Sequence, residues 1–255
     1  MTLWIDAEPD MFGISRMYEY CYQIGEWTWV WSSRVDECAR DFEKLIDRLQ
    51  EFAPDHLPVI CLGHHSNFRY AVYPQYKGNR VWVRKAPGYG AFREWIQEYY
   101  ATLSFDNIEA DDVIGIKARP GDLIYSKDKD LKTIAGLHLE PDGTVVEVTE
   151  VEANRRLYKQ ILCGDSADNY KGCPGVGDKH KLFSQERWNK PNNTEQKFWE
   201  LCLMEFAKAE KLFKQRGIEE VPYAHAITMA RCARILRSGE YDFENKRPVL
   251  WRGPS

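Results

Sequence analysis

The chain has 255 residues, 44% hydrophobic and 29% charged, with a formal net charge of −4. It is long enough to bury a full core, and no apolar run approaches the roughly 20 residues of a membrane-spanning helix. No basic stretch followed by an apolar segment opens the chain, so no secretory signal is predicted. The seven cysteines are scattered and form no CxxC pair, which predicts reduced thiols in the core of a cytoplasmic protein.

Strands and helices are predicted to alternate over residues 1–150. Short apolar runs predict strands at 3–6, 59–62 and 122–126, and a sheet-edge hairpin strand at 144–148. The spacing of apolar residues predicts helices over 33–52, around 92–99 and over 110–118. From residue 151 the pattern is helical, with helices expected around 199–207 and 226–236. We therefore expect an α/β domain over 1–150 and a helical part over 151–255.

Acidic clusters follow one another along the chain, most of them at the ends of predicted strands. They are Asp6, then EADD with Glu109, Asp111 and Asp112, then DKD with Asp128 and Asp130, and finally GDSADN with Asp165 and Asp168. The carboxyl ends of strands form the binding crevice of an open α/β sheet, where so many carboxylates need divalent cations to offset their repulsion. Any one cluster also fits a helix cap. Their joint occurrence predicts a two-metal site for phosphodiester hydrolysis.

The segment GDSADNYKGCPGVGDKHK predicts a phosphate-binding turn. Its glycines imply a tight turn between two helices with backbone groups facing outward, and they are Gly172, Gly175 and Gly177. A second helix beginning near Asp178 would direct its amides at a phosphate, with Lys179 and Lys181 nearby. The alternative is an ordinary connector between helices.

A basic and aromatic segment, YKGNR, precedes Arg84 and Lys85. Tyr76 beside Lys77 and Arg80 suits stacking on an unpaired base while the cations hold phosphates. The alternative is a solvated run of charges. The residues from 77 to 90 have the composition of a flexible loop.

These motifs resemble those of the flap endonuclease/5′-nuclease family, most closely the 5′→3′ exonucleases of T-odd bacteriophages. The resemblance covers YKGNR, EADD, DKD, GDSADN, GCPGVG and the C-terminal RILRSGEYDFENKRPVLW. It implies a PIN-like, mostly parallel sheet flanked by helices, and a C-terminal helical part with a helix–three-turn–helix module near 157–187. That module would grip duplex DNA and hold K⁺. An arch or clamp for the 5′ strand would lie near 77–90.

The resemblance also assigns roles to single residues. Asp6, Glu109 and Asp111 match ligands of the first metal, and the second-metal group is Asp128, Asp130, Asp165 and Asp168. Lys77 and Arg80 match residues that contact the scissile phosphate, and Tyr76 matches the stacking aromatic. One position departs from the family, because His64 stands where an aspartate near the first metal is expected. Imidazole is a poor ligand for Mg²⁺ but a fair one for Mn²⁺, so His64 could change the metal preference. The alternative is that this residue contacts the metal only through a water molecule.

We therefore expect a 5′-nuclease that uses two Mg²⁺ ions, or Mn²⁺ in their place, on duplex DNA with a 5′ end, nick or flap, and on RNA primers annealed to DNA. The alternative is a structure-specific DNA-binding protein of the same fold that cleaves weakly because of His64. A haloacid-dehalogenase-like phosphohydrolase is disfavoured, because Glu8 stands where that chemistry needs a second aspartate. We expect a monomer, in the bacterial host cytoplasm if the chain is phage-encoded. Most of the nine tryptophans, among which is the run WTWVW at 27–31, are expected to pack in the core or sheet.

Overall fold

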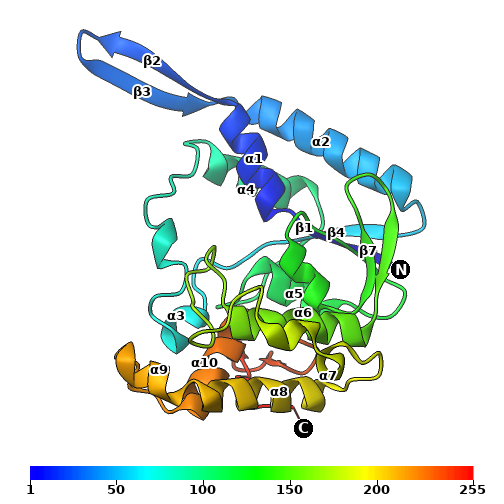
Figure 1. Ribbon diagram of the computed structural model, residues 1–255. Helices are drawn as coiled ribbons and strands as arrows, with labels where there is room; N and C mark the ends of the chain where they lie inside the picture. The colour runs from blue at the N-terminus through cyan, green and yellow to red at the C-terminus, as the bar shows by residue number, and fades with distance from the viewer. Residues whose placement is uncertain (255) are drawn as a thin grey trace. The chain divides into compact units, whose positions relative to one another are not determined.

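The computed structural model describes residues 1–254, and the chain divides into two compact units (Figure 1). Unit 1 comprises residues 1–64, 83–129 and 136–147, and unit 2 comprises residues 65–82, 130–135 and those from 148 onward. Each unit has its own hydrophobic cluster. Residues 65–82 and 130–135 thus pack with the second unit, although they lie within the first 150 residues of the chain.

Unit 1 is built on a six-stranded sheet with the order β5-β4-β1-β6-β7-β8. The pairs β4–β5, β1–β4, β1–β6 and β6–β7 are all parallel. The strands are β1 (Thr2–Asp6), β4 (Leu57–Cys61), β5 (Thr102–Leu103), β6 (Leu123–Tyr125), β7 (Gly136–Leu139) and β8 (Val145–Val148). The strand order reverses at β1, so the crevice of the sheet lies at the carboxyl ends of β1 and β6. The predicted mostly parallel α/β sheet is confirmed.

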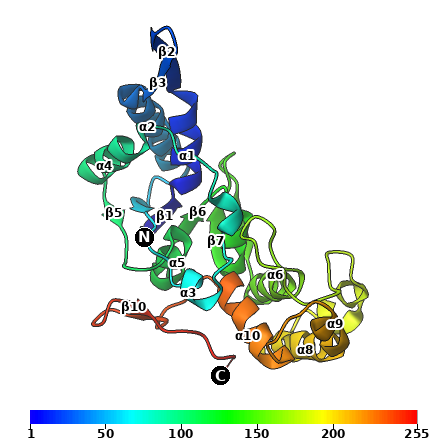
Figure 2. The same ribbon diagram turned by 90° about the vertical axis from the view of Figure 1, so that its left-hand side faces the viewer.

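Helices cover both faces of this sheet (Figures 1 and 2). The helices α1 (Glu8–Met17), α2 (Val35–Phe52) and α4 (Tyr89–Tyr99) share one core with β1 and β4. In α2 the apolar stripe runs through Cys38, Phe42, Ile46 and Leu49, as its helical spacing predicts. The helix α5 (Ala110–Lys117) contacts β1 and β4 on the other face.

A two-stranded hairpin connects α1 to α2 and extends away from the rest of unit 1 (Figure 1). Its strands are β2 (Glu19–Gly25) and β3 (Thr28–Ser33), so α2 begins at Val35 rather than at the predicted Ser33. Of the core or sheet packing expected for the WTWVW run, the core part is wrong, because Trp27, Trp29 and Trp31 are 86%, 60% and 53% exposed. The run lies instead on the hairpin turn and β3.

Unit 2 is mainly helical, as predicted, and α6, α8 and α10 pack on one another around the buried Trp188, Phe198 and Phe206 (Figure 2). Its α-helices are α3 (Arg69–Val72), α6 (Glu150–Cys163), α7 (Glu186–Asn189), α8 (Glu195–Lys208), α9 (Glu210–Gln215) and α10 (Pro222–Ala233). Short 3-10 helices span Gly78–Arg80, Lys129–Thr133 and Lys181–Ser184, and β9 (Tyr241–Asp242) pairs with β10 (Arg247–Pro248).

A buried arginine explains where α10 ends. Arg69 is 1% exposed, and its guanidinium donates to the carbonyl of Cys232 at 3.1 Å and to that of Arg234 at 2.7 Å. The last carbonyls of the helix therefore bond to a side chain instead of to a further helical turn. This is why the helix predicted to reach residue 236 ends at Ala233.

The prediction that a second helix begins near Asp178 is wrong. Residues 177–180 are turn or coil, and only a 3-10 helix (Lys181–Ser184) and the four-residue α7 follow. The side chain of His180 accepts from the Leu182 amide at 3.4 Å and thereby caps the 3-10 helix. The glycine segment is thus followed by short helical turns, so it has no long helix to direct a row of amides at a phosphate.

All seven cysteines are free thiols, and five are buried, which agrees with their predicted place in the core. Among residues 1–254, no helix is both long and apolar enough to cross a lipid bilayer.

Candidate metal centre and nucleic-acid contacts

Asp6 ends β1, the strand at which the sheet order reverses, and its side chain is almost fully buried at 5% exposure. The Ser126 hydroxyl, just after β6, donates to its Oδ2 at 2.8 Å, and the Glu8 amide lies 3.4 Å from its Oδ1. Burial raises the pKa of Asp6 to about 7, and the negative charges of Glu8 and Asp128 contribute to the rise. A buried carboxylate with further acids around it is suited to a cation.

The EADD cluster forms the start of α5. Carboxylate oxygens of Glu109, Asp111 and Asp112 all lie within 4.8 Å of one another, close enough for one metal ion. The fully buried Asp112 accepts from the Glu109 amide at 3.1 Å, and Asp111 accepts from the Asp112 amide at 2.7 Å. The capping interpretation and the metal interpretation therefore both fit, and Asp112 is the residue most committed to the cap.

The departure at His64 has acidic neighbours that the sequence did not reveal. Glu8 accepts from the Gly63 amide at 3.0 Å and from Arg93 at 3.2 Å, and Arg93 also donates to the Gly63 carbonyl at 2.6 Å. The His64 imidazole lies 3.9 Å from a carboxylate oxygen of Asp106. Carboxylates therefore lie beside this turn, although no acid lies close to it in sequence.

Two predicted metal ligands in unit 2 share one hydrogen-bond donor. The amide of Gln160, on α6, donates to Asp130 at 2.9 Å and lies 3.4 Å from Asp165. Asp165 also exchanges backbone hydrogen bonds with Tyr170 at 2.9 and 3.0 Å, which closes the turn that contains Asp168. Gln160 thus holds Asp130 and Asp165 close together. Residues that hydrogen-bond to metal-binding carboxylates in this way commonly orient them.

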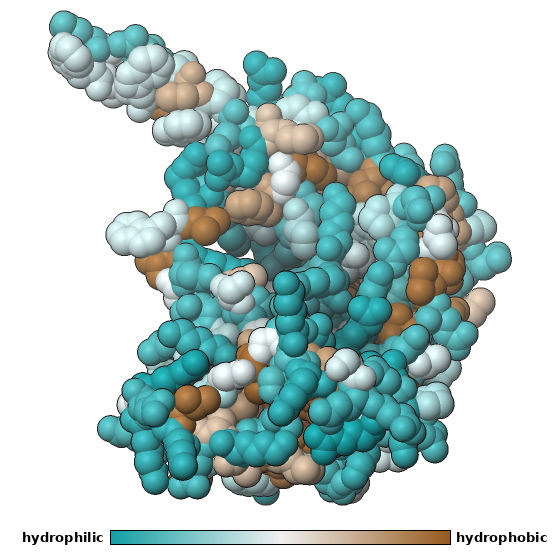
Figure 3. Space-filling model, in the orientation of Figure 1, coloured by the Kyte–Doolittle hydropathy of each residue, from teal (hydrophilic) through white to brown (hydrophobic). Residues whose placement is uncertain are grey.

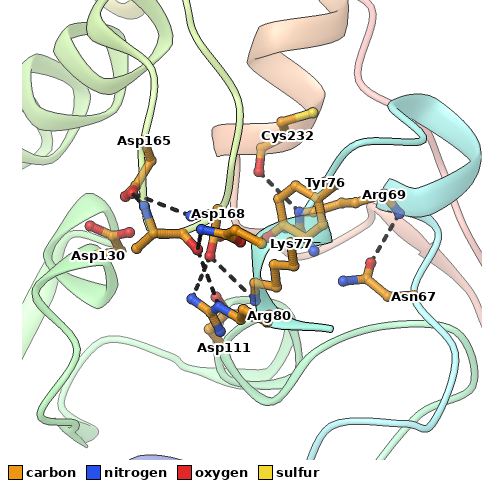
Figure 4. A network of polar contacts seen from close by, with 12 residues as sticks. Asn67, Arg69, Tyr76, Lys77, Arg80, Asp111, Asp130, Asp165, Asp168 and Cys232 are labelled. Carbon is orange, nitrogen blue, oxygen red and sulfur yellow. Dashed lines mark hydrogen bonds and ion pairs between the residues drawn. The ribbon is translucent and has the colours of Figure 1, made fainter. Parts of the chain in front are cut away.

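Asp168 is the centre of a network with the YKGNR segment (Figure 4). Its carboxylate accepts from the Tyr76 hydroxyl at 2.6 Å and from Arg80 at 2.7 Å, and the Lys77 ammonium lies at 3.7 Å. Its carbonyl accepts from the Lys77 amide at 2.8 Å. Lys77 has a left-handed φ of 51°, a conformation that this bond helps to hold. The predicted basic pair and the predicted ligand therefore lie together.

The prediction that Tyr76 stacks on an unpaired base is wrong. Its ring is 2% exposed and stacks on Tyr170, with centroids 6.4 Å apart, and Arg69 lies 5.9 Å from the ring centre. No face remains for a base, so the ring is part of the core of unit 2. Its hydroxyl donates to Asp168 and holds that carboxylate in place.

Arg84 and Lys85, predicted to bind DNA, both engage residues of unit 1. Arg84 forms an ion pair with Glu19 at 2.8 Å and lies 4.7 Å from the centre of the Trp31 ring. Lys85 lies 4.1 Å from the centre of the Tyr89 ring. Arg84 is therefore part of the base of the hairpin, and binding of DNA by either residue stays a prediction.

The three glycines of the turn differ in what surrounds them. A Cβ at Gly172 would lie 2.4 Å from the backbone nitrogen of Gly164, so this glycine allows two backbone segments to pack. A Cβ at Gly175 would meet only a methyl of Leu212, at 2.9 Å, whereas one at Gly177 would meet nothing within 4 Å. Lys179 and Lys181 are exposed. Among the three, Gly177 is open to a ligand and Gly172 is structural.

The predicted residues are thus divided between the units. Unit 1 holds Asp6, His64, Glu109, Asp111, Asp112 and Asp128, and unit 2 holds Tyr76, Lys77, Arg80, Asp130, Asp165, Asp168 and the glycine turn. Sequence reasoning missed the outer contacts of these carboxylates, namely Ser126, Arg93, Gln160 and the role of Glu8. Their only sequence signal is proximity to strand ends or, for Gln160, a place on the helix that leads to GDSADN.

Comparison with known proteins agrees with the motifs. Residues 33–159 match the N-terminal resolvase-like domain of the 5′–3′ exonucleases. The chain is 30% identical over 216 residues to the exodeoxyribonuclease of Enterobacteria phage T3, covering 71% of this chain and 68% of that protein. It is 29% identical over 213 residues to the exonuclease of Escherichia phage T7, with the same coverage of 71% and 68%.

A solved structure supports the fold. The structure of T5 5′-exonuclease with bound zinc ions aligns with a TM-score of 0.51 and 15% identity, over 91% of this chain and 93% of that chain. This likeness confirms the PIN-like α/β fold that the sequence predicts. The ordered acidic motifs, the matched domain and the phage T3 relative together place this chain in the 5′–3′ exonuclease family.

Proposed function

We propose that this protein is a divalent-metal-dependent nuclease that hydrolyses phosphodiester bonds of DNA at a 5′ end, nick or 5′ flap. The observation that carries the proposal is the buried Asp6 at the end of β1, whose pKa is raised to about 7 within a set of further carboxylates. Burial and neighbouring acids disfavour the charged form of this carboxyl group, and a bound cation would offset that penalty. Membership of the 5′–3′ exonuclease family supplies the substrate class.

The residues present fit hard divalent cations. The atoms that would bind the metal are carboxylate oxygens, which are the ligands that Mg²⁺ and Mn²⁺ prefer. We propose that the carboxylates of unit 1, Asp6, Glu109 and Asp111, hold one ion. Asp130 and Asp165 of unit 2, bridged by Gln160, hold the second. Two bound ions supply charge neutralisation of the phosphate and a water of lowered pKa.

Lys77 and Arg80 would stabilise the negative charge that develops on the phosphate. Their partner in unit 2 is Asp168, and the Arg80 side chain is 49% exposed, so a phosphate oxygen can reach it. The Tyr76 hydroxyl orients Asp168, and Asp168 in turn orients both cations. Replacing Arg80 with alanine should lower single-turnover cleavage by roughly 10²–10³-fold, the scale for one preorganised donor. An effect confined to KM would show that Arg80 only collects substrate.

The glycine turn would hold duplex DNA. Gly177 is open and Lys179 and Lys181 are exposed, which supports approach of a phosphate to the backbone, with K⁺ bound by turn carbonyls. We propose this role for the turn without the long second helix that the sequence predicts.

The test is cleavage of a 5′-labelled nicked duplex carrying a 5′ flap. Wild type should cleave it with Mg²⁺ or Mn²⁺ and not in a chelator. Replacing Asp128 and Asp130 together with asparagine should abolish cleavage and leave DNA binding within about threefold, because catalysis and phosphate contacts use different residues. Asp142→Asn, at the exposed turn between β7 and β8, is the matched control and should retain wild-type activity. A double variant with the wild-type rate would refute the metal assignment.

Two further measurements refine the proposal. Calorimetric titration with Mn²⁺ should give two sites, of which Asp111→Asn removes one and Asp165→Asn the other. A single site would reduce the mechanism to one ion. A substrate whose 5′ strand is RNA annealed to DNA tests activity on primers. The weakly cleaving DNA-binding protein is the correct alternative if wild type binds the flap but leaves it intact with both metals.

A further inference from the structure

The β2–β3 hairpin carries large aromatic side chains on both faces. Strand pairing places Tyr20 and Tyr22 on one face, with rings stacked at 5.9 Å, and Trp29 and Trp31 on the other. All four are 40% or more exposed. In Figure 3 the hairpin stands out from the rest of unit 1, and much of its surface has the pale colour of intermediate hydropathy. Contiguous exposed patches of this kind mark protein interaction sites.

The hairpin also offers one regular strand edge. It is a two-stranded sheet, and no other element of unit 1 covers its long edges (Figure 1). The register of β2 shifts between Gln23 and Gly25, and such a bulge makes an edge unsuited to pairing. β3 (Thr28–Ser33) continues without a shift, so its outer edge presents a row of backbone donors and acceptors.

The charges of the hairpin argue against a nucleic-acid surface. Glu19 is neutralised by Arg16 at 3.3 Å and by Arg84 at 2.8 Å. What remains is the exposed Glu26 at the tip and the exposed Arg34 at the base, which lies 5.5 Å from the centre of the Tyr20 ring. Neither of these two charges forms an ion pair within residues 1–254. A surface that binds nucleic acid would be strongly positive, whereas here the arginines exceed the glutamates by a single charge (Arg16, Arg34 and Arg84 against Glu19 and Glu26), and the surface is rich in Trp and Tyr, as protein interfaces are.

The β3 edge is complementary to itself. When two copies of β3 pair antiparallel about Val30, each Trp29 lies opposite the partner's Trp31, and each Thr28 lies opposite the partner's Ser32. The same register sets the turn of one hairpin, which holds Glu26, beside the base of the other, where Arg34 follows β3, so an acid and an arginine lie near each other at both ends of the contact. Aromatic pairs, hydroxyl pairs and opposite charges are the cross-strand pairs that stabilise antiparallel sheets.

We propose that two copies of this chain associate through β3 into a four-stranded antiparallel sheet, β2–β3–β3–β2, with a two-fold axis at Val30. The contact is isologous, so it closes as a dimer and not as a filament. The monomer expected from the sequence is the alternative that the experiment below distinguishes from this dimer. Because one hairpin per copy buries little area, the dissociation constant should lie in the micromolar range.

Sedimentation equilibrium of the full chain tests the dimer, with protein concentrations up to about 100 µM to populate a weak contact. Glu26→Arg and Arg34→Glu should each weaken the dimer about tenfold, because each places like charges near one another at both ends of the contact. The double variant restores opposite charges and should return the dissociation constant to within about threefold of wild type. Glu98→Arg, an exposed glutamate of α4, is the control and should change nothing.

A crosslink tests the register. In a Cys21→Ser background, Val30→Cys should form a disulfide-linked dimer under mild oxidation, because the two thiols face each other on the axis. Ser32→Cys in the same background should not, because it lies opposite Thr28.

Several results would overturn the proposal: a monomer at the highest concentration, single variants without effect, or a double variant that fails to restore association. A monomer whose tryptophan fluorescence is quenched by single-stranded DNA would assign the hairpin to nucleic acid instead. Flap cleavage, measured in parallel, should be unchanged in the hairpin variants, so failure of the dimer and failure of the nuclease proposal give different results.

Discussion

Replacing Asp6 with asparagine should stabilise the metal-free protein at pH 8. The buried carboxyl has a pKa of about 7, compared with 3.8 for the solvated group. The folded protein therefore binds this proton more tightly than the unfolded chain does. Stability attributable to Asp6 falls as the pH rises from 3.8 to 7 and stays low above pH 7.

The two pKa values set the size of the effect. Their difference corresponds to about 4 kcal/mol of destabilisation above pH 7, at 1.36 kcal/mol per pKa unit. Asparagine removes this penalty, but it accepts the Ser126 hydroxyl more weakly and cannot accept from the Glu8 amide through its nitrogen. We therefore expect a net gain of about 2 kcal/mol at pH 8, and a smaller one at pH 5, where the penalty is only partly present.

Urea unfolding in a chelator at both pH values measures this gain. Asp122→Asn is the matched control, from the opposite end of the same sheet. Although burial raises the pKa of Asp122, hydrogen bonds from Trp4, Thr2 and Arg119 lower it overall, so this carboxylate stabilises the fold above pH 3.8. Its replacement should destabilise the protein at pH 8.

Metal ions should reverse the order of stability. Added Mn²⁺ should stabilise wild type, because the ion binds only the folded state, and it should stabilise Asp6→Asn much less. The reasoning about Asp6 is refuted if its asparagine variant is no more stable than wild type at pH 8 in the chelator, or if the gain is the same at pH 5.

Three more outcomes follow from the site. Tyr76→Phe keeps the buried ring but removes the donor to Asp168, so it should lower the free energy of unfolding by about 1–2 kcal/mol in urea denaturation. Single-stranded DNA binding should not change, and a loss of binding would return the ring to a stacking role. His64→Asp should raise flap cleavage at low Mg²⁺ and narrow the advantage of Mn²⁺, since a hard oxygen ligand replaces imidazole; equal activity across both titrations would favour an outer-shell contact. Gly177→Val should weaken duplex binding in a gel-shift assay without loss of stability, whereas Gly172→Val should lower the melting temperature, because its Cβ would clash with backbone.

The fold was predictable because periodic patterns and strand-end acids are local signals. The parallel sheet, the stripe of α2 and the start of α5 at EADD all follow from residues a few positions apart. The hairpin was not recognised, because its alternating aromatic residues resemble a buried strand in composition. Only the tertiary arrangement shows that these side chains remain 40% or more exposed, even where Arg84 lies over the Trp31 ring.

The acidic residues of the candidate site could be predicted from the sequence, but most of the residues that hydrogen-bond to them could not. The carboxylates stand out because several acids recur in order at strand ends. Gln160 and Arg93 act through contacts with residues distant in sequence, so no short motif contains them. Tyr76 was misassigned for a related reason. An aromatic residue beside two cations looks like a stacking platform, and its burial depends on Tyr170, far along the chain.

The buried Arg69 gives the YKGNR segment one fixed end. It ties the short helix α3 to the end of α10, seven residues before Tyr76. Beyond Arg80 the chain is exposed to solvent, since Val81 and Trp82 are 74% and 92% exposed. Insertions and deletions should therefore be accommodated after Arg80, where they disturb no buried contact, and not between Arg69 and Tyr76. The length of the loop could then vary among relatives without moving the residues that orient Asp168.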